Sequence, residues 1–247
     1  DVSMIAQVPL RRGIASGLWA PLDEELLPNL EFVRPQLVAH NADDQVVAVG
    51  AVSWYITLVT NTDTYPEAPT SWAELWEDHP NRIGLLALPA NSFLLEVTAE
   101  TFFGGSDILA SEEGVLEVLA KLEEVRPNVQ LWYRDEGQFQ QALQSGEIPM
   151  GQYYHDVTGL AAAEGFPVHS TFPQEGGILD SGSWAVTRAS DRLEEAHVFI
   201  NWFSQPEIQD LVAREVGTAP IVEREHLSLS DEEFAAVSSE IEPIIPY

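Results

Sequence analysis

Apolar stretches of strand length alternate with amphipathic stretches of helix length along most of the chain. The strand-like stretches are rich in Val, Ile, Leu and Tyr, as expected of buried strands. They predict strands at residues 45–52, 55–62, 82–88, 128–133, 148–154, 166–172 and 183–187. Strands that alternate with helices indicate βαβ units and mostly parallel sheets. The pattern therefore predicts an α/β fold.

Helices are predicted where apolar residues recur at intervals of three and four positions. They are expected at residues 71–78, 91–103, 111–125, 136–146, 156–165 and 190–205, and again after Pro206 and Ser230. Ser71 with Glu74, and Ser230 with Glu233, have the capping-box spacing that marks a helix N-terminus. No internal repeat or low-complexity linker interrupts this order, so two lobes would have to be joined through strands.

The composition is that of a folded chain: 247 residues, of which 45% are apolar and 9% aromatic. No run of about 18 apolar residues is present, so no membrane-spanning helix is expected. The first residues do not have the pattern of a signal peptide, which we expect to be absent from this chain. The absence of Cys excludes disulfides, thiolate catalysis and zinc–thiolate sites.

Charge is the strongest global signal, because 40 acidic residues oppose 11 basic ones and the formal net charge is −29. Such a surface repels phosphate backbones, so no nucleic-acid partner is expected. Two interpretations of the acidity stay open. It suits a salt-adapted surface, where ions screen charges over roughly 8 Å or less. Alternatively, the acidic field attracts cations.

Motifs of nucleotide-dependent and hydrolytic enzymes are missing from the sequence. It contains no G-x-S-x-G, G-x-x-x-x-G-K-[ST], G-x-G-x-x-G or H-E-x-x-H pattern. His197 lies close to Phe199 and Ile200 in an expected helix, where a packed or half-exposed histidine is the simpler interpretation. We therefore expect neither catalysis nor a cofactor.

Aromatic side chains gather at the ends of the expected strands. They are Trp54 and Tyr55 between two strands, Trp132 and Tyr133, Tyr153 and Tyr154, and Trp184. In α/β sheets, ligands bind outside the carboxyl ends of the strands. Aromatic rings placed there hold planar or cationic groups, at roughly 0.5–2 kcal/mol per contact. Packing of helices onto the sheet is the alternative, and both interpretations stay open for Tyr154 and Trp184.

Four stretches of the chain carry a resemblance to a known family. In order, they read SGLWAPLDEELLPNLEFV, PEAPTSWAELWED, EGFPVHSTFPQEGGILDSGSWAVTRAS and EEAHVFINWFSQPEIQDLVAREVGTAPIV. Each is weak alone, but the ordered set spans nearly the whole chain. It resembles the extracytoplasmic substrate-binding proteins of ABC importers, of the spermidine/putrescine-binding type.

The resemblance implies a two-lobed type II periplasmic-binding-protein fold, with crossover hinge strands and the ligand in the cleft between the lobes. Lobe one would comprise residues 1–57 and 181–222, and lobe two residues 58–180 and 223–247. The chain opens at a point that resembles the segment after the family's first strand, helix and second strand. We therefore expect this N-terminal part of lobe one to be missing.

The resemblance also implies positions for ligand contacts. Tyr154 stands where the polyamine binders have an aromatic residue. Their acid that grips an amine corresponds to Gly182, and this chain carries Asp180 two residues earlier. On the first helix of lobe two, Asn91 and Leu94 replace family acids. These departures preserve the importer class but leave polyamine specificity open.

The predicted function is the capture of a small organic solute, with a cationic, polyamine-like solute as one candidate, and its delivery to an ABC permease in the membrane. The expected ligand contacts are Tyr154, Tyr153, Asp180, Trp184, Trp54 and Asn91. The protein is expected to be a monomer in the periplasm or an equivalent extracytoplasmic space. Two alternatives stay open: a ferric-ion-binding protein of the same superfamily that uses Tyr153 and Tyr154 as metal ligands, and an enzyme on a two-lobed α/β scaffold.

Overall fold

The computed structural model describes residues 2–88 and 91–246. Within them, eight strands form one mixed sheet whose main order is β1-β8-β3-β6-β4-β5, with β2 and β7 also paired to β3. The strands are β1 (Val2–Ala6), β2 (Val38–His40), β3 (Val46–Asn61), β4 (Ile83–Leu86), β5 (Val129–Tyr133), β6 (Met150–Tyr154), β7 (Val168–Thr171) and β8 (Ile178–Val186). The α-helices are α1 (Gln7–Ala15), α2 (Leu94–Phe103), α3 (Glu112–Glu123), α4 (Glu136–Ser145), α5 (His155–Ala163), α6 (Leu193–Phe203), α7 (Pro206–Val216) and α8 (Asp231–Ala235). None of these helices is both long enough and apolar enough to cross a membrane.

The chain divides into two compact units. Unit 1 comprises Asp1–Trp54 and Asp180–Ser238, and unit 2 comprises Tyr55–Leu179 and Ser239–Tyr247. Residues 223–238 therefore fall in unit 1, although we expected them beside residues 58–180. The reason is apolar packing, because Leu229, Phe234 and Val237 form a buried cluster with Ala213 of α7.

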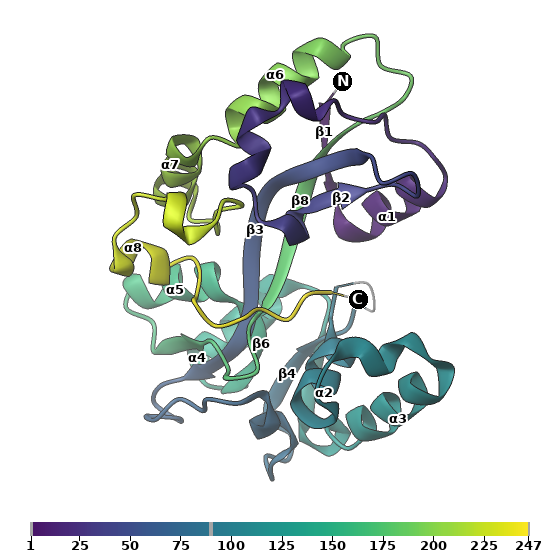
Figure 1. Cartoon of the computed structure of the whole chain (residues 1–247). Helices are drawn as coiled ribbons and strands as arrows, with labels where there is room; N and C mark the ends of the chain where they lie inside the picture. Colours follow the sequence, from purple (N-terminus) through teal and green to yellow (C-terminus); the bar gives the residue numbers. More distant parts are fainter. Residues whose placement is uncertain (1, 89–90, 247) are drawn as a thin grey trace. The chain divides into compact units, whose positions relative to one another are not determined.

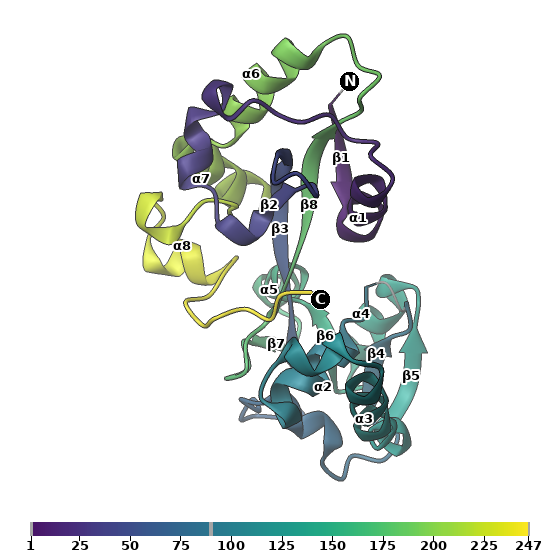
Figure 2. The same cartoon turned by 45° about the vertical axis from the view of Figure 1, so that its right-hand side comes forward.

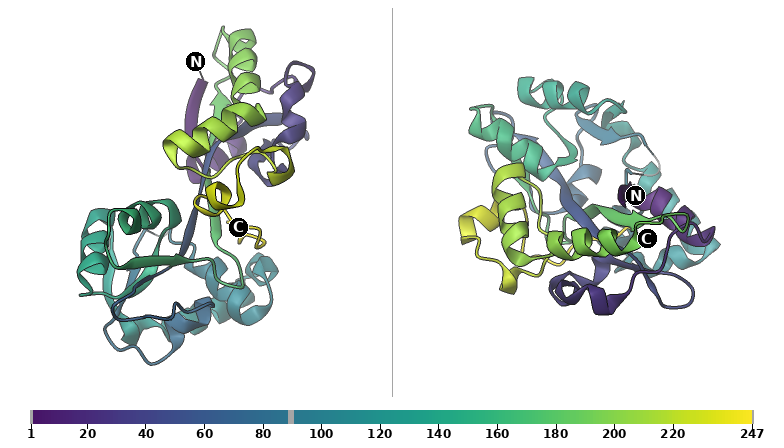
Figure 3. Two further views of the ribbon diagram at one scale, coloured as in Figure 1. Left: turned by 90° about the vertical axis from the view of Figure 1, so that its left-hand side faces the viewer. Right: turned by 90° about the horizontal axis from the view of Figure 1, so that it is seen from above.

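Strand β3 carries the chain from unit 1 into unit 2 without a break. The prediction of two strands, with Trp54 and Tyr55 between them, is wrong: one strand of 16 residues covers both. Both aromatic residues favour extended backbone, so nothing at this point ends the strand. Beside it, β8 carries the chain back into unit 1 (Figure 3).

In unit 1, β1 pairs antiparallel with β8, and helices cover both faces of these strands (Figures 1 and 2). On the α1 side, Leu10 and Trp19 pack against Val47 and Ala185. The expected strand at residues 183–187 begins earlier, at Ile178, and the polar residues near its start are buried.

His197 of α6 is packed, as predicted, and is 3% exposed. Its Nε2 accepts the backbone N–H of Asp23 at 2.7 Å, and its Nδ1 lies 2.7 Å from the carbonyl oxygen of Leu193. A ring that accepts at Nε2 and donates at Nδ1 is neutral. The histidine therefore fastens the segment that begins at Asp23 to α6.

In unit 2, β4 pairs in parallel with β5 and β6, as the βαβ pattern predicts. The prediction of a mostly parallel sheet is wrong, because β1, β2, β6 and β7 all pair antiparallel with their neighbours β8 or β3. Helices α2 and α3 cover one face of these strands and α4 and α5 the other (Figure 2). The centre of the α4 face is a stack of Phe139 on Tyr133, with ring centroids 4.8 Å apart. Gly84 and Gly151 lie directly beneath Phe139, where any side chain would collide with its ring.

The two capping-box signals have different outcomes. The box of Ser230 and Glu233 is formed at the start of α8, as predicted. Ser71 does accept the N–H of Ala73, but the carboxylate of Glu74 lies 2.8 Å from Nε2 of His79 instead of reaching back. The expected helix at 71–78 is accordingly only a short 3₁₀ helix, Trp72–Trp76.

We predict that Gly151→Ala destabilises the protein by about 3 kcal/mol, the cost of overpacking a core. An added Cβ would lie 2.2 Å from the carbonyl oxygen of Gly84, a backbone atom that cannot rotate away. Gly159→Ala is the matched control, since a Cβ there meets nothing within 4 Å. It should be neutral or stabilising by up to about 1 kcal/mol, because alanine favours helix. Urea unfolding of both variants measures the difference, and equal midpoints would contradict the packing described.

Candidate functional site

Asp180 is a carboxylate in unit 1 that is almost completely withdrawn from water. It is 4% exposed, and its Oδ1 accepts the backbone N–H of Ser181 at 2.8 Å. Burial raises its pKa from 3.8 to about 6, against the lowering effect of that hydrogen bond. Within the described residues, no Lys or Arg forms an ion pair with it. A buried acid in this state gains from a cation supplied from outside.

Trp54 stands on strand β3, which neighbours strand β8 of Asp180 in the sheet. A Cβ on Gly182 would lie 3.8 Å from Cγ2 of Val52, so these two positions are on the same face of the neighbouring strands β8 and β3. Trp54 follows Val52 by two residues on β3, and Asp180 precedes Gly182 by two residues on β8. Because side chains alternate between faces with a period of two, both lie on the face of Val52.

The indole of Trp54 is half-buried, and its Nε1 is a buried donor without a hydrogen-bond partner. A buried polar atom left unsatisfied costs stability unless a ligand or water completes it. Trp54 and Asp180 therefore combine an open donor, an aromatic face and a carboxylate. That set is suited to an ammonium group, through charge pairing and cation–π attraction.

Trp184 stands on the same face of β8, four residues beyond Asp180. Its ring packs edge-on against Phe199 and Phe203 of α6, at 5.0 and 5.4 Å between centroids. This is the packing interpretation that the sequence left open. A role for Trp184 as a ligand contact stays a prediction.

Tyr154 ends β6 in unit 2, at the edge where the parallel strands β4, β5 and β6 all finish. Its hydroxyl donates to Oε1 of Glu136 at 2.7 Å, and Glu136 is the first residue of α4. The ring is half-buried, with one side against Tyr153 at 5.2 Å between centroids. Glu136 thus fixes the phenol at the position where ligands approach an α/β sheet.

Tyr153 belongs to the core of unit 2. It is 3% exposed, packs edge-on against Phe139 at 5.5 Å, and donates its hydroxyl to the Glu136 carbonyl at 3.3 Å. Burial, followed by the negative charge of Glu136, raises its pKa to about 12. To bind a ferric ion as a phenolate, Tyr153 would have to lose its hydroxyl proton, and the described residues contain no group of three or more His, Asp or Glu side chains that could hold a metal ion. The ferric alternative is therefore not supported.

Asn91 lies in a turn, where its N–H donates to the carbonyl of Leu88 at 2.9 Å. It was expected at a helix start, but α2 begins only at Leu94, after Phe93 has adopted a left-handed conformation with φ of 49°. The backbone thereby turns before the helix. The contact role of Asn91 stays a prediction.

Two polar residues near Tyr154 were not singled out from the sequence. Gln152 is fully buried on β6; its Nε2 donates to the Ser92 carbonyl, while its Oε1 has no hydrogen-bond partner. Asp156 is the second residue of α5, two positions after the N-cap Tyr154. Its Oδ1 is buried without a partner, and burial raises its pKa. A glutamine inside an apolar strand was the one signal available.

Comparison with known proteins gives relatives of one kind. The chain is 27% identical over 230 residues to a gamma-aminobutyric acid-binding protein of Pseudomonas aeruginosa, an alignment that covers 90% of this chain and 61% of the relative. It is 26% identical over 204 residues to the spermidine/putrescine-binding periplasmic protein of Salmonella typhimurium, covering 81% of this chain and 57% of the relative. The chain thus spans about three fifths of the length of these curated relatives.

The fold matches a solved structure of a spermidine/putrescine ABC transporter substrate-binding protein from Streptococcus pneumoniae, with a TM-score of 0.74 at 17% identity. That match covers 98% of this chain and 78% of the solved one. The fold is the two-lobed α/β fold of substrate-binding proteins, as predicted. A family model of bacterial extracellular solute-binding proteins matches residues 1–234. Because this match covers nearly the whole chain, the chain belongs to the bacterial extracellular solute-binding protein family.

Proposed function

We propose that this protein is the solute-binding component of an ABC importer and that its solute carries a primary ammonium group on a short aliphatic chain. It acts outside the cytoplasm, performs no catalysis and passes the solute to a membrane permease. The family and the relatives support the solute-binding role. The observation that carries the ligand class is the buried carboxylate of Asp180, which has no ion-pair partner among the described residues, on the sheet face that also carries the indole of Trp54.

The ligands in the names of the two relatives support the same chemistry. Gamma-aminobutyric acid, spermidine and putrescine differ in length and charge, but each ends in a primary amine on methylene groups. An ammonium is the group that would neutralise Asp180 and lie against an aromatic face. We therefore assign Asp180 and Trp54 of unit 1 to the ammonium end of the solute.

The acidic surface is consistent with this ligand class. A net charge of −29 creates a field that attracts small cations and speeds their encounter with the protein. The same field is screened by salt, so it affects the rate of association more than the final contacts.

A thermal-shift series tests the proposed function. Putrescine, spermidine and gamma-aminobutyric acid are compared with butyrate, which lacks the amine, and with ferric citrate. A solute present at 100 times its Kd should add about 2.7 kcal/mol to the free energy of unfolding. We expect at least one of the amines to raise Tm and neither control to do so. No shift with any amine would contradict the proposed ligand class.

Asp180→Asn should have two opposite effects. Without the carboxylate, amine affinity should fall at least about tenfold, because a charge-assisted contact is lost. In the absence of ligand, the variant should be more stable above pH 6. The folded state holds the Asp180 pKa at about 6 against 3.8, so a charged carboxylate is unfavourable when buried. A shift of this size corresponds to about 3 kcal/mol, and the difference should vanish as pH falls below 4.

Asp210→Asn is the matched control for this variant. Asp210 is also buried, at 5% exposed, but its oxygens accept the N–H and hydroxyl of Ser228. Its loss should lower stability by about 1–3 kcal/mol and leave amine affinity unchanged. Calorimetric titration and urea unfolding of both variants supply the readouts. A stabilised Asp180→Asn protein that binds amines as tightly as the original would remove Asp180 from the site.

A further inference from the structure

The β5 strand at the free end of the sheet in unit 2 has open surface on both sides. β5 is the last strand in the sheet order and pairs with β4. The Tyr133 carbonyl accepts the N–H of Ala87 at 2.7 Å, so the backbone groups of the preceding Trp132 point away from β4. Unpaired groups at a sheet edge are a template for another strand.

One groove lies on the α3 side of β5. It has a volume of about 340 Å³ and is lined by Leu119, Leu122 and Trp132, with Glu123 and Arg126 at the rim. Trp132 is 44% exposed and Leu119 is 45% exposed. Large apolar side chains exposed side by side around a hollow are typical of surfaces that bind another protein.

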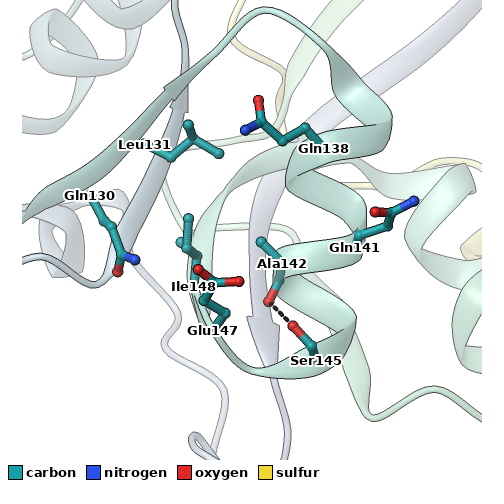
Figure 4. A pocket seen from close by; sticks show the side chains of 8 residues that line it. All are labelled: Gln130, Leu131, Gln138, Gln141, Ala142, Ser145, Glu147 and Ile148. Carbon is teal, nitrogen blue, oxygen red and sulfur yellow. Dashed lines mark hydrogen bonds between the residues drawn. The ribbon is translucent and has the colours of Figure 1, made fainter.

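A second groove lies on the α4 side of the same strand, with a volume of about 480 Å³ (Figure 4). Its lining is different, because Gln130, Gln138 and Gln141 supply amide groups and Glu147 a carboxylate. The two grooves flank opposite faces of the sheet. Leu131 packs toward α4 while its neighbour Trp132 lines the α3 groove, and adjacent residues of a strand point to opposite faces.

We propose that β5 binds an extended, basic segment of another protein by strand addition. A strand laid along β5 places alternate side chains over the two grooves, apolar ones toward Trp132 and hydrogen-bonding ones toward the glutamines. This is the arrangement in which backbone bonds supply affinity and two rows of pockets supply specificity. The inference concerns a partner surface and does not depend on the proposed solute.

Charge selects the basic partner. Helix α3 carries four glutamates, and the cations on it and just after it are already engaged: Lys121 pairs with Glu124 and Arg126 with Glu123. A second copy of this chain would bring another charge of −29 to the same surface. Like charges disfavour that association, whereas Lys or Arg residues flanking the added strand would be attracted.

A register shift limits how much of β5 takes part. Ile83 pairs with Val129 and Gly84 with Leu131, which leaves Gln130 as an extra residue. Such a bulge interrupts pairing at an edge. The added strand therefore pairs only alongside Leu131–Tyr133, and the grooves supply the remaining contacts.

The test is the selection, at low salt, of peptides from a displayed random library that bind the original protein. Peptides that bind equally well to the Trp132→Glu variant are discarded. We expect selected peptides to alternate apolar with polar residues and to carry basic ends. They should slow hydrogen exchange of the Trp132 amide, bind at least about tenfold more weakly to Trp132→Glu, and weaken further in salt. Trp202→Glu is the matched control, since Trp202 is 48% exposed on α6 in unit 1, and it should bind normally.

Trp132→Thr keeps strand propensity and provides a second variant whose fold is readily preserved. It should lose most of the peptide affinity as well. The proposal is overturned if no peptide is enriched on the original protein over Trp132→Glu. It is equally overturned if the enriched peptides leave exchange at residues 131–133 unchanged.

Discussion

The central constraint is strand β3, which is too long to belong to one unit. Its 16 residues pair with β2 and β8 in one part and with β6 and β7 in the other. Because the backbone is hydrogen-bonded along this length, the residues at the crossing have fixed directions. Trp54, the last residue of unit 1, shares a face with Val52, and β8 brings Asp180 to the same face. The candidate ammonium site is therefore a consequence of how the chain passes between its units.

The electrostatic character of that site follows from what is missing around it. The chain has 40 acidic and 11 basic residues, and the ion pairs described for its cations are mostly exposed. Asp180 is buried with a single backbone donor, so its charged form is unfavourable in the unliganded protein. A bound cation would neutralise this buried charge, so the free energy that the charge costs the unliganded protein would be regained as affinity for the ligand.

Much of the fold was predictable because its signals are local. Apolar spacing and caps place α3, α4 and α8 within two residues, and the parallel core of unit 2 follows from the alternation of strands and helices. The failures arise from long-range contacts. Sequence could not show that Trp54 and Tyr55 continue one strand, or that Glu74 binds His79 rather than completing a cap. For the site, the resemblance singled out Tyr154, but only the packing around Phe139 assigns Tyr153 to the core. Asp156 and Gln152 went unnoticed because an unsatisfied buried oxygen leaves no mark in sequence.

The central claim is that an ammonium group pairs with Asp180, and proton release on binding tests it most directly. At pH 6 the carboxyl is about half protonated without ligand, whereas the amine is already fully charged. Calorimetric titration of the amine in buffers with different ionisation enthalpies counts the protons exchanged. The account predicts release of about half a proton per ligand at pH 6, falling toward zero at pH 8, and no release from Asp180→Asn. A binding heat at pH 6 that is independent of the buffer would contradict it.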